Sequence, residues 1–315
     1  MDENKLKGHD LLTLRNYSSE DIKQIIDLAI EQKKELKEKG FHAHRPLQNK
    51  SVAMYFEKQS LRTRVSFEVG IAQLGGQPIF IHSSATHSKR GEPIKDMSRV
   101  LARYVDGIVF RANRHEDIVQ MAEFSSVPII NALCDQAHPC QALTDLMTIF
   151  EHKGRKHVKV AYIGDAANNV ALSLITVFSK TGIDLSLGCP AGYRPPEALL
   201  NEANENCGKS GSMIEIFEDP IAAVRDADII YTDVWVSMGD EEEAEKRFRD
   251  FEGYMITNDM LKAAGKDVLF MHDMPAHRGE EVHEDVIDGA RSIVIDQAEN
   301  RLHAQKAVMT LLIGD

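Results

Sequence analysis

Short apolar runs alternate with longer segments of helical periodicity along most of the chain. From about residue 50 onward, each apolar run is followed by a polar turn and then by apolar positions spaced three or four residues apart. This alternation is typical of parallel strands joined by crossover helices, so it predicts an α/β fold. The predicted strands cover residues 51–56, 77–81, 107–111, 127–131, 158–163, 184–188, 213–217, 228–232 and 268–271.

The same spacing predicts several of the helices individually. Near the N-terminus, a capping sequence at residues 18–21 precedes an apolar stripe, and residues 31–40 form the charged end of the same helix. A second long helix is predicted over residues 139–150, with Pro139 at its first position. The last helix is predicted over residues 298–312, because apolar positions recur there at helical spacing. The stripe of the first helix consists of Ile22, Ile25, Ile26, Ala29 and Ile30.

The length of the chain predicts two lobes, because 315 residues exceed what one hydrophobic core usually organises. A basic stretch at residues 153–157 follows the helix predicted over 139–150 and marks the expected boundary. We therefore expect domains at residues 1–150 and 151–315. Each domain is predicted to be a mostly parallel sheet flanked by helices, and the C-terminal helix, about residues 298–315, is expected to return to the first domain.

Charge and cysteine content exclude several classes of function. Asp and Glu outnumber Lys and Arg by 49 to 37, and a net charge of −12 repels nucleic acid and anionic membranes. The four cysteines have neither C-x-x-C nor metal-finger spacing, so reduced thiols are expected. No apolar run reaches the length of a membrane span, and the N-terminus lacks the apolar core of a secretory signal. We expect a cytoplasmic protein that binds neither nucleic acid nor membranes.

Residues 60–64, with the sequence S-L-R-T-R, form the strongest candidate site. They lie between the strand predicted over 51–56 and a helix that ends at Gly75. Backbone N–H groups at the start of this helix, its dipole and the guanidinium groups of Arg62 and Arg64 would converge on one anion, and phosphate fits best. The alternative is a surface cluster of salt bridges. Apolar residues such as Val65 and Val69 predict instead that the helix is buried.

Two further segments of the first domain place polar side chains where strands end or helices begin, the edge at which open α/β sheets bind ligands. Arg111 ends the strand predicted over 107–111 and would bring a third guanidinium to the edge that carries residues 60–64. His138 precedes the helix-starting Pro139, where an imidazole can donate to an oxyanion. Cys140 could suggest a thiol nucleophile, but packing is the favoured interpretation because no activating partner is evident.

Three segments of the second domain have the same position after a strand. Residues 163–170 contain a glycine turn and the pair Asn168 and Asn169, which could bind an amino acid or cap the following helix. Residues 233–239 place Asp233, a hydroxyl and a glycine after a strand and could hold a cationic ligand. Residues 271–281 combine histidines and carboxylates beside a proline turn, and a solvated loop is an equal alternative. The G-x-G-x-x-G spacing of a nicotinamide site is absent.

Taken together, these segments resemble the aspartate/ornithine carbamoyltransferase family over nearly the whole chain. Residues 60–64 match the family's S-T-R-T-R loop with Leu61 in second place, and residues 138–141 match its H-P-x-Q element. Residues 233–239 match D-x-x-x-S-M-G, the loop of ornithine-using members. The resemblance implies carbamoyl-phosphate ligands at Ser60, Leu61, Arg62, Thr63, His87, Arg111, His138, Gln141, Asp273, Met274 and Arg301. It implies ornithine ligands at Asn169, Asp233, Ser237 and Met238.

The resemblance also implies a reaction and an assembly. Residues 1–150 would bind carbamoyl phosphate and residues 151–315 L-ornithine, and transfer of the carbamoyl group would give L-citrulline and phosphate, a step of arginine metabolism. No metal or organic cofactor is needed. A homotrimer or a multiple of trimers is expected, with His87 reaching the neighbouring subunit's site. The alternatives are a carbamoyltransferase acting on another amine and a catalytically silent homologue.

Two residues depart from the family pattern. Leu61 replaces a threonine whose backbone N–H contacts phosphate, and that N–H is retained. Asp273 replaces the cysteine of the family's H-C-L-P motif, so we expect its carboxylate to pair with the incoming ammonium and to accept its proton. The residues expected to act in catalysis are Arg62, Thr63, Arg111, His138 and Asp273.

Overall fold

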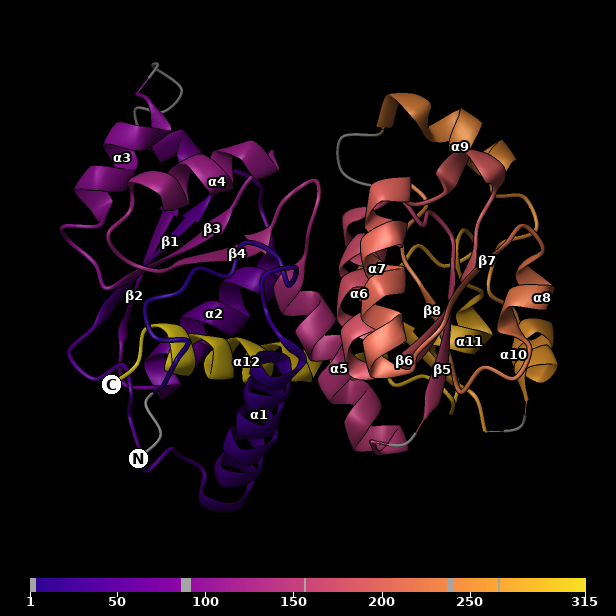
Figure 1. Ribbon diagram of the computed structural model, residues 1–315, viewed down its shortest axis with the longest axis horizontal. Helices are drawn as coiled ribbons and strands as arrows, with labels where there is room; N and C mark the ends of the chain where they lie inside the picture. Colours follow the sequence, from indigo (N-terminus) through magenta and orange to yellow (C-terminus); the bar gives the residue numbers. More distant parts are fainter. Residues whose placement is uncertain (1–3, 86–91, 156, 237–240, 266) are drawn as a thin grey trace. The chain divides into compact units, whose positions relative to one another are not determined.

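The chain folds into two compact units in the computed structural model, which describes residues 4–85, 92–155, 157–236, 241–265 and 267–315 (Figure 1). The first unit consists of residues 1–147 together with the C-terminal residues 299–315, and the second of residues 148–298. Helices α5 (Pro139–Lys153) and α12 (Val294–Leu312) both contain a boundary between the units. Helix α12 therefore begins four residues before the predicted start at residue 298.

The first unit is built on a four-stranded parallel sheet in the order β2-β1-β3-β4. Its strands are β1 (Ser51–Phe56), β2 (Gln77–His82), β3 (Gly107–Arg111) and β4 (Ile129–Leu133). The first three agree with the predicted ranges within one residue. Strand β4 begins two residues later than predicted, because its register on β3 starts with Ile129 beside Ile108.

Helices cover both faces of this sheet (Figure 1). Helices α2 (Leu61–Gln73), α1 (Ser19–Lys39) and α12 lie on one face, and α3 (Ile94–Leu101) and α4 (His115–Phe124) lie on the other. Parallel strands are joined by right-handed crossovers, so a helix changes face when the chain reverses its direction of travel across the sheet. That reversal occurs between β1 and β3.

The second unit contains a five-stranded parallel sheet in the order β7-β6-β5-β8-β9. Its strands are β5 (Val158–Ile163), β6 (Ile183–Gly188), β7 (Ile214–Phe217), β8 (Ile229–Thr232) and β9 (Leu269–His272). Each agrees with the predicted range within one residue at either end. Here the chain reverses direction between β5 and β8, so the carboxyl ends of these two strands form the switch point of the sheet.

The helices of the second unit follow from that reversal. Helices α6 (Asn169–Thr181) and α7 (Glu197–Ser210) lie on one face of the sheet, and α8 (Pro220–Val224) and α10 (Asn258–Ala264) on the other (Figure 1). Shorter helices are α9 (Ala244–Asp250) and α11 (Glu284–Ile287). Single 3-10 turns cover Ser83–Ala85, Ala191–Tyr193 and Glu241–Glu243.

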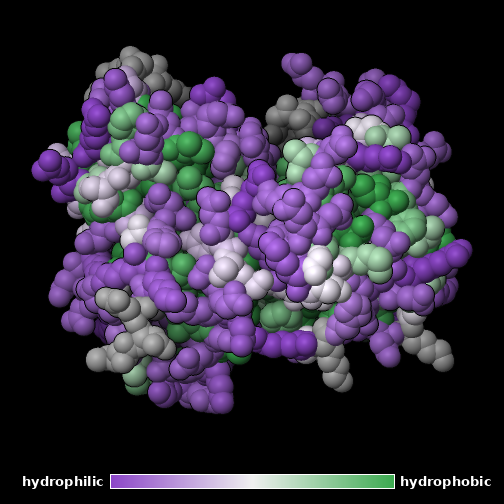
Figure 2. Space-filling view, in the orientation of Figure 1, coloured by the Kyte–Doolittle hydropathy of each residue, from purple (hydrophilic) through white to green (hydrophobic). Residues whose placement is uncertain are grey.

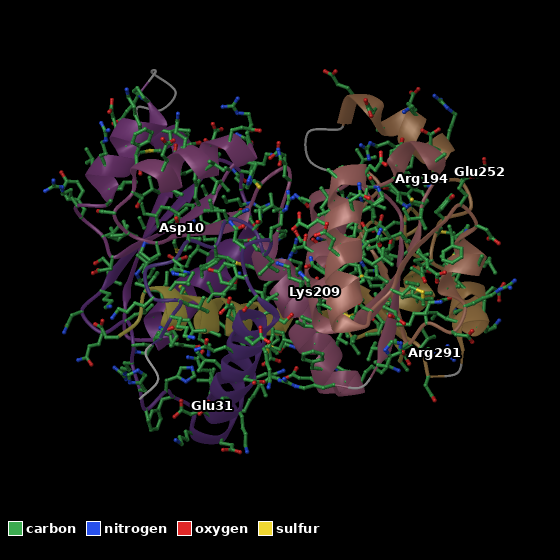
Figure 3. The ribbon with its side chains drawn as sticks, in the orientation of Figure 1. Asp10, Glu31, Arg194, Lys209, Glu252 and Arg291 are labelled. Carbon is green, nitrogen blue, oxygen red and sulfur yellow. The ribbon has the colours of Figure 1, made fainter. Side chains whose placement is uncertain are left out.

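The N-terminal segment is tied to the first sheet before α1 begins. Asp10, labelled in Figure 3, accepts a hydrogen bond from the Ile129 N–H at 2.8 Å, and Leu11 pairs with Ile130 of β4. Helix α1 then begins after Ser18, whose hydroxyl accepts from the Asp21 N–H while the Asp21 carboxylate accepts from the Ser18 N–H. The predicted cap at residues 18–21 is therefore confirmed, and Gly40 ends the helix with φ 78°.

The prediction that the helix after residues 60–64 is buried on its apolar side is wrong for half of that helix. Phe67, Gly70 and Ile71 of α2 are buried, but Leu61, Val65 and Val69 are 77%, 47% and 38% exposed. These exposed positions are four residues apart and form one stripe. Apolar spacing alone does not say which of two apolar faces packs on the sheet, because a helix can present only one face to it.

Polar and charged residues predominate on the face of the molecule shown in Figure 2. Among the described residues, no helix combines the length and apolar character needed to cross a membrane.

Gly188, at the carboxyl end of β6, provides a test of the packing between the second sheet and α8. A Cβ there would lie 2.6 Å from Ile163 Cδ1 and 3.0 Å from Ala223 Cβ. We expect Gly188→Ala to lower the free energy of unfolding by about 1–3 kcal/mol through overpacking, measured by urea denaturation. Gly208→Ala is the matched control: it lies in α7 with open space around it and should raise that free energy by up to about 1 kcal/mol. An unchanged midpoint for Gly188→Ala would contradict the close approach of α8.

Candidate active site

The first part of the site is the N-terminus of α2. Strand β1 ends buried at Phe56, and Ser60 caps the helix by accepting a hydrogen bond from the Thr63 N–H at 3.3 Å. Thr63 itself is fully buried although its side chain is polar. This end of α2 lies beside the switch point between β1 and β3, so its free N–H groups and positive dipole end are directed to the edge where ligands bind.

Two buried arginines converge on Thr63. Arg111 at the end of β3 donates to the Thr63 hydroxyl oxygen at 3.3 Å, and Arg301 of α12 donates to the same atom at 2.9 Å. Both arginine side chains are buried, so two positive charges lie beside one hydroxyl group. Two guanidinium groups converging on one point can bind an anion such as phosphate through charge-assisted hydrogen bonds.

His138 joins this cluster through its Nε2 atom. Arg301 lies 3.1 Å from Nε2, and because a guanidinium is only a donor, Nε2 must accept this hydrogen bond. Burial, followed by the charges of Arg301 and Arg111, holds the pKa of His138 well below its usual value. The ring is therefore neutral. The donor role predicted for His138 requires either the other ring nitrogen or a turn of Arg301 away from Nε2.

The remaining predicted residues of the first unit have different surroundings. Arg64 turns away from the cluster: its Nε donates to Glu68 at 3.2 Å, and its guanidinium carbon lies 3.8 Å from the centre of the Phe80 ring. The prediction that Arg64 converges with Arg62 on an anion is therefore wrong for this structure. Arg62 is partly exposed, and the Leu61 side chain points into solvent.

Residues near the start of α5 are buried. Gln141 donates from Nε2 to Asp145 at 2.7 Å, while its Oε1 has no hydrogen-bond partner among the described residues. Burial raises the pKa of the Cys140 thiol to about 12, and its sulfur donates to the Asn131 carbonyl oxygen at 3.5 Å. The favoured interpretation of Cys140 as a packing residue agrees with this, because a nucleophile requires a thiolate.

In the second unit, the turn after β5 supplies the neighbours of Asp233. Asn168 caps α6 through Oδ1, and its Nδ2 donates to Asp233 at 3.1 Å and to the Tyr162 hydroxyl at 2.9 Å. Asn169 is the first residue of α6 and is partly exposed. The cap interpretation of this turn is confirmed for Asn168, and the ligand interpretation stays a prediction.

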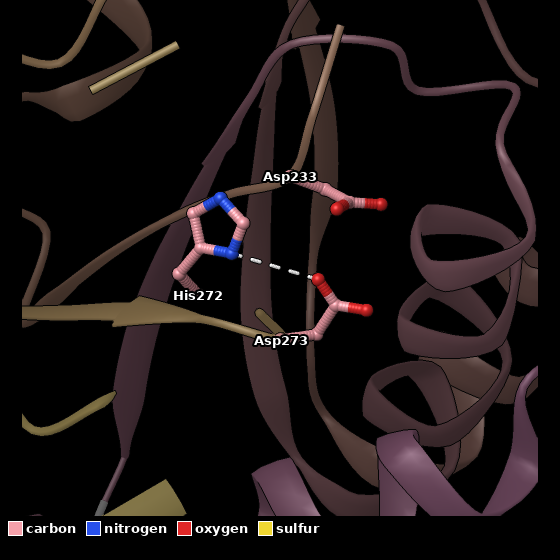
Figure 4. A group of neighbouring side chains, drawn as sticks. All are labelled: Asp233, His272 and Asp273. Atoms are coloured by element: carbon pink, nitrogen blue, oxygen red, sulfur yellow. Dashed lines mark ion pairs between the residues drawn. The ribbon is translucent and has the colours of Figure 1, made fainter. Parts of the chain in front are cut away.

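Asp233 and Asp273 form a pair of neighbouring carboxyl groups (Figure 4). Burial is the main cause that raises the pKa of Asp233 well above its usual value, and the charge of Asp273 and a hydrogen bond between the two carboxyl groups add to it. Two carboxylates so close cannot both be ionised at low cost. The raised pKa of Asp233 therefore favours the protonated form of this carboxyl group beside Asp273.

A buried relay fixes the backbone next to Asp273. His272 Nδ1 accepts from the Met274 N–H at 2.9 Å, so Nε2 carries the ring proton and donates to Glu281 Oε1 at 3.1 Å. Glu281 also accepts from the His277 N–H at 2.6 Å and is fully buried. Met274 has a φ of 61°, which a side chain disfavours, and this N–H bond to His272 helps to hold it. The contact of 3.6 Å between His272 Nδ1 and Asp273, dashed in Figure 4, becomes an ion pair only if the ring gains a second proton.

Two groups of side chains have the spacing of metal ligands among the described residues. One consists of Asp233, His272 and Asp273, whose ligand atoms lie within 4.8 Å of one another. Both nitrogens of His272 are already engaged, so only the two carboxyl groups remain to bind a cation, and an ammonium group suits them. The other group consists of His277, Glu280 and Glu281.

An ion pair that the sequence analysis missed connects the two loops of this switch point. Arg247 of α9 donates to Asp165 at 2.7 Å and to the Trp235 carbonyl oxygen at 3.0 Å, and it is buried. Asp165 follows β5 and Trp235 follows β8. No sequence signal indicates this pair, because Arg247 lies in a charged helix that resembles a solvated one.

Three predicted site residues lie outside the described part of the chain. They are His87, Ser237 and Met238. The structure brings Ser60, Thr63, Arg111, His138 and Arg301 together in the first unit, and Asp233, Asp273 and Met274 in the second. Residues that the sequence analysis did not single out are Tyr162, Arg247, His272 and Glu281.

Comparison with known proteins identifies the family. The model of the aspartate/ornithine carbamoyltransferase carbamoyl-P binding domain matches residues 9–151, and the model of the Asp/Orn binding domain matches residues 156–312. This chain belongs to the aspartate/ornithine carbamoyltransferase family.

Full-length relatives within this family support the assignment. The chain is 51% identical over 312 residues to an ornithine carbamoyltransferase of Pyrococcus abyssi, covering 98% of this chain and 97% of that protein. A solved structure of ornithine carbamoyltransferase from Pyrococcus furiosus is 50% identical over 98% of both chains, with a TM-score of 0.93. An anabolic ornithine carbamoyltransferase from Campylobacter jejuni is 38% identical, with a TM-score of 0.89, and covers 96% of this chain and 97% of that chain. The α/β fold with two parallel sheets, predicted from the alternation of apolar runs, is thus that of this carbamoyltransferase family.

Proposed function

We propose that the protein is an ornithine carbamoyltransferase, which transfers the carbamoyl group of carbamoyl phosphate to the side-chain amine of L-ornithine and releases L-citrulline and phosphate. Relatives of nearly the same length that carry this name support the assignment. The observation that carries it is the convergence of Arg111 and Arg301 on Thr63 beside the N-terminus of α2. Such a site is built for a phosphate group.

Carbamoyl phosphate would bind in the first unit. Its phosphate would accept from the N–H groups of residues 60–64 and from Arg62, and it would displace Thr63 as the acceptor of Arg111 and Arg301. As the carbonyl oxygen gains negative charge during attack, the same buried cations stabilise it and the leaving phosphate. Carbonyl oxygens of Asp273 and Met274 are proposed for the carbamoyl NH2, with Gln141 and the neighbouring subunit's His87 as further ligands.

L-Ornithine would be bound by residues of the second unit. We assign Asn169, Ser237 and Met238 to its amino-acid group and Asp233 to its side-chain amine. An alkylammonium has a pKa of about 10.4, so it must lose a proton before it can attack. We propose that Asp233 and Asp273 share one proton and that the pair takes a second proton from the ammonium group, which leaves both carboxyl groups neutral. The raised pKa of Asp233 supports this role. The new C–N bond then forms as the C–O bond to phosphate breaks, and the second amine proton leaves with phosphate.

We further propose that the enzyme assembles as a homotrimer or as a multiple of trimers in the cytoplasm. The exposed stripe of Leu61, Val65 and Val69 on α2, with Ile79 on the neighbouring β2, supplies an apolar surface beside the phosphate loop. An apolar stripe of this kind is typical of a subunit interface. A site completed by His87 of a neighbour would require such an interface.

Val65→Lys tests this assembly. A charge in the middle of the stripe should reduce a trimer to smaller species, because an ammonium cannot be buried there without a partner. Sedimentation velocity would measure the change. Val119→Lys on α4 is the matched control, since Val119 is 43% exposed and lies outside the stripe. If Val65→Lys sediments like the wild type while Val119→Lys does not, the interface lies elsewhere.

A colorimetric citrulline assay tests the reaction. The enzyme is supplied with carbamoyl phosphate and, in parallel, with ornithine, putrescine, lysine or acetylornithine. We expect turnover with ornithine at least about 100-fold above the other amines, because a site with placed polar partners strongly rejects ligands that leave them unpaired. Turnover with another amine alone would overturn the assignment of ornithine, and no turnover with any amine would overturn the assignment as an enzyme.

A further inference from the structure

A chain of hydrogen-bonded polar side chains in the first unit, buried at its centre, lies away from the residues assigned to substrate. Lys306 of α12 is fully buried, and its ammonium lies 2.8 Å from His42 Nε2 and 3.0 Å from Gln73 Oε1. His42 is also buried, and its Nδ1 lies 3.0 Å from Glu35 Oε2. We call these four residues the Lys306 relay. It joins α12 to the C-terminal end of α2 and to the end of α1.

The direction of each hydrogen bond follows from the chemistry of the groups. An ammonium group only donates hydrogen bonds, so His42 Nε2 accepts from Lys306. The ring proton is then on Nδ1, which donates a hydrogen bond to Glu35. The hydrogen bond from His42, with a second one from Lys39, lowers the pKa of Glu35 to about 2, so it is a carboxylate. The relay thus has a cation at one end, a neutral imidazole in the middle and an anion at the other end.

The helices that the relay connects are the helices that carry the phosphate site. Helix α12 carries Arg301 as well as Lys306, and α2 carries Thr63 as well as Gln73. The helices cross where α2 has Gly70, because a Cβ at that position would lie 3.2 Å from both Lys306 Cγ and Met309 Cε. Figure 1 shows α12, in yellow, beside α2 and α1. On one side of this crossing, Lys306 donates a hydrogen bond to Gln73 at the C-terminal end of α2. On the other side, Arg301 donates to Thr63 near the N-terminal end of α2.

We propose that Lys306 is a positioning residue for the carbamoyl phosphate site proposed above: through Gln73 and His42 it fixes α12 on α2 and so holds Arg301 at Thr63. A slip of α12 along α2 would move the Arg301 guanidinium relative to the start of α2. Displacements of about 1 Å at a binding group are enough to cost much of its effect. An apolar residue would fill this position without a buried charge, so packing alone does not account for a lysine here.

Titration of Lys306 gives the relay a distinctive pH dependence. Burial lowers the pKa of Lys306 to about 8, so the ammonium is lost over a range in which the phosphate of the substrate is already fully ionised. The groups next to Lys306 do not change their charge in the pH range in which Lys306 loses its proton. Gln73 is uncharged, Glu35 is ionised throughout, and burial together with the charge of Lys306 lowers the pKa of His303 to about 3. Lys39 and Lys33 of α1 pair with Glu35 and Asn300.

The test compares Lys306→Met with the wild type from pH 7 to 9.5. Citrulline formation gives kcat and the KM for each substrate, and titration calorimetry with inorganic phosphate gives a dissociation constant that does not depend on turnover. We expect Lys306→Met to raise the KM for carbamoyl phosphate and the phosphate dissociation constant about tenfold at pH 7 while leaving the KM for ornithine unchanged. In the wild type both constants should rise above pH 8, and in Lys306→Met this rise should be absent.

Gln32→Leu is the matched control, because the Gln32 amide donates to Thr310 of α12 at 2.9 Å, a hydrogen bond that joins α1 to α12 and does not involve α2. It should leave both constants and their pH dependence as in the wild type. Wild-type constants that stay flat between pH 7 and 9.5 would overturn the positioning role even if Lys306→Met fails to fold. The positioning role would also be overturned if Lys306→Met lost affinity equally for both substrates and melted at a lower temperature than the wild type. Failure of the wild type to make citrulline would instead remove the proposed reaction, and phosphate binding would still report on the relay.

Discussion

Arg301→Met is expected to lower kcat/KM for carbamoyl phosphate about 1,000-fold. Arg301 donates to the Thr63 hydroxyl at 2.9 Å and to His138 Nε2 at 3.1 Å, and it is buried. Its loss removes a cation from the place where negative charge develops in the reaction. Steady-state citrulline kinetics would measure the loss, and thermal unfolding would show whether the variant is folded.

The same substitution should change the ionisation of His138. The charge of Arg301 is the largest cause, after burial, that lowers the pKa of this ring. In Arg301→Met that pKa should therefore move up toward its ordinary value, and the acid side of the pH profile for kcat/KM should move to higher pH with it. Arg114→Met is the matched control, since Arg114 is exposed and pairs with Asp117 at 2.6 Å. A loss below about tenfold for Arg301→Met would mean that Arg111 alone supports the phosphate.

Asp273→Asn is expected to give the second largest effect, a fall in kcat of about 100-fold, because one half of the proton-accepting pair becomes neutral. The charge of Asp273 is one of the causes that raise the pKa of Asp233. Removing it lets Asp233 ionise at a lower pH. The acid limb of kcat/KM for ornithine should therefore move to lower pH even though the maximal rate falls. Rates measured from pH 5 to 9 would separate the two effects.

Stability provides an independent check on the carboxyl pair. A carboxyl group whose pKa is raised on folding makes the folded state lose stability as pH rises from the unfolded value of 3.8 through the folded pKa. Replacing Asp273 by Asn weakens this loss, so the variant should melt at a higher temperature than the wild type at pH 8. Asp273→Cys restores the residue of the family's H-C-L-P motif and is expected to keep kcat within about tenfold of the wild type. An unchanged pH profile in Asp273→Asn would show that the pair does not share a proton.

Positions at the ends of strands were predictable because they depend on local pattern. A buried parallel strand is a short apolar run, and the polar residues that follow it must lie at the carboxyl edge of its sheet. For this reason Ser60, Arg111 and Asp233 could be assigned to such edges from spacing alone. The boundary errors, two residues for β4 and four for α12, occur where register on a neighbouring strand or helix packing decides the end.

Side-chain direction was not predictable from the same pattern. Arg62 and Arg64 are equivalent in the sequence motif, but Glu68 lies one helical turn after Arg64 and Phe80 lies on the neighbouring strand, and together they turn Arg64 away. Val65 and Val69 look like core residues and lie on the exposed side of α2. Both outcomes depend on which face of the helix packs on the sheet, and that depends on residues distant in the sequence.

The sequence by itself determined the α/β class, the approximate limits of the strands, the capped turn before α2 and the family, because these follow from periodicity and from motifs of adjacent residues. Only the tertiary structure decided that Arg111 and Arg301, which lie 190 positions apart, meet at one hydroxyl, and that Asp273 lies close enough to Asp233 to help raise its pKa. Only the structure placed Lys306 against His42 and Gln73. The physical reason is the same in each case. The charge that such a group carries depends on its burial and on partners brought by other strands and helices, and neither is encoded in its immediate neighbours.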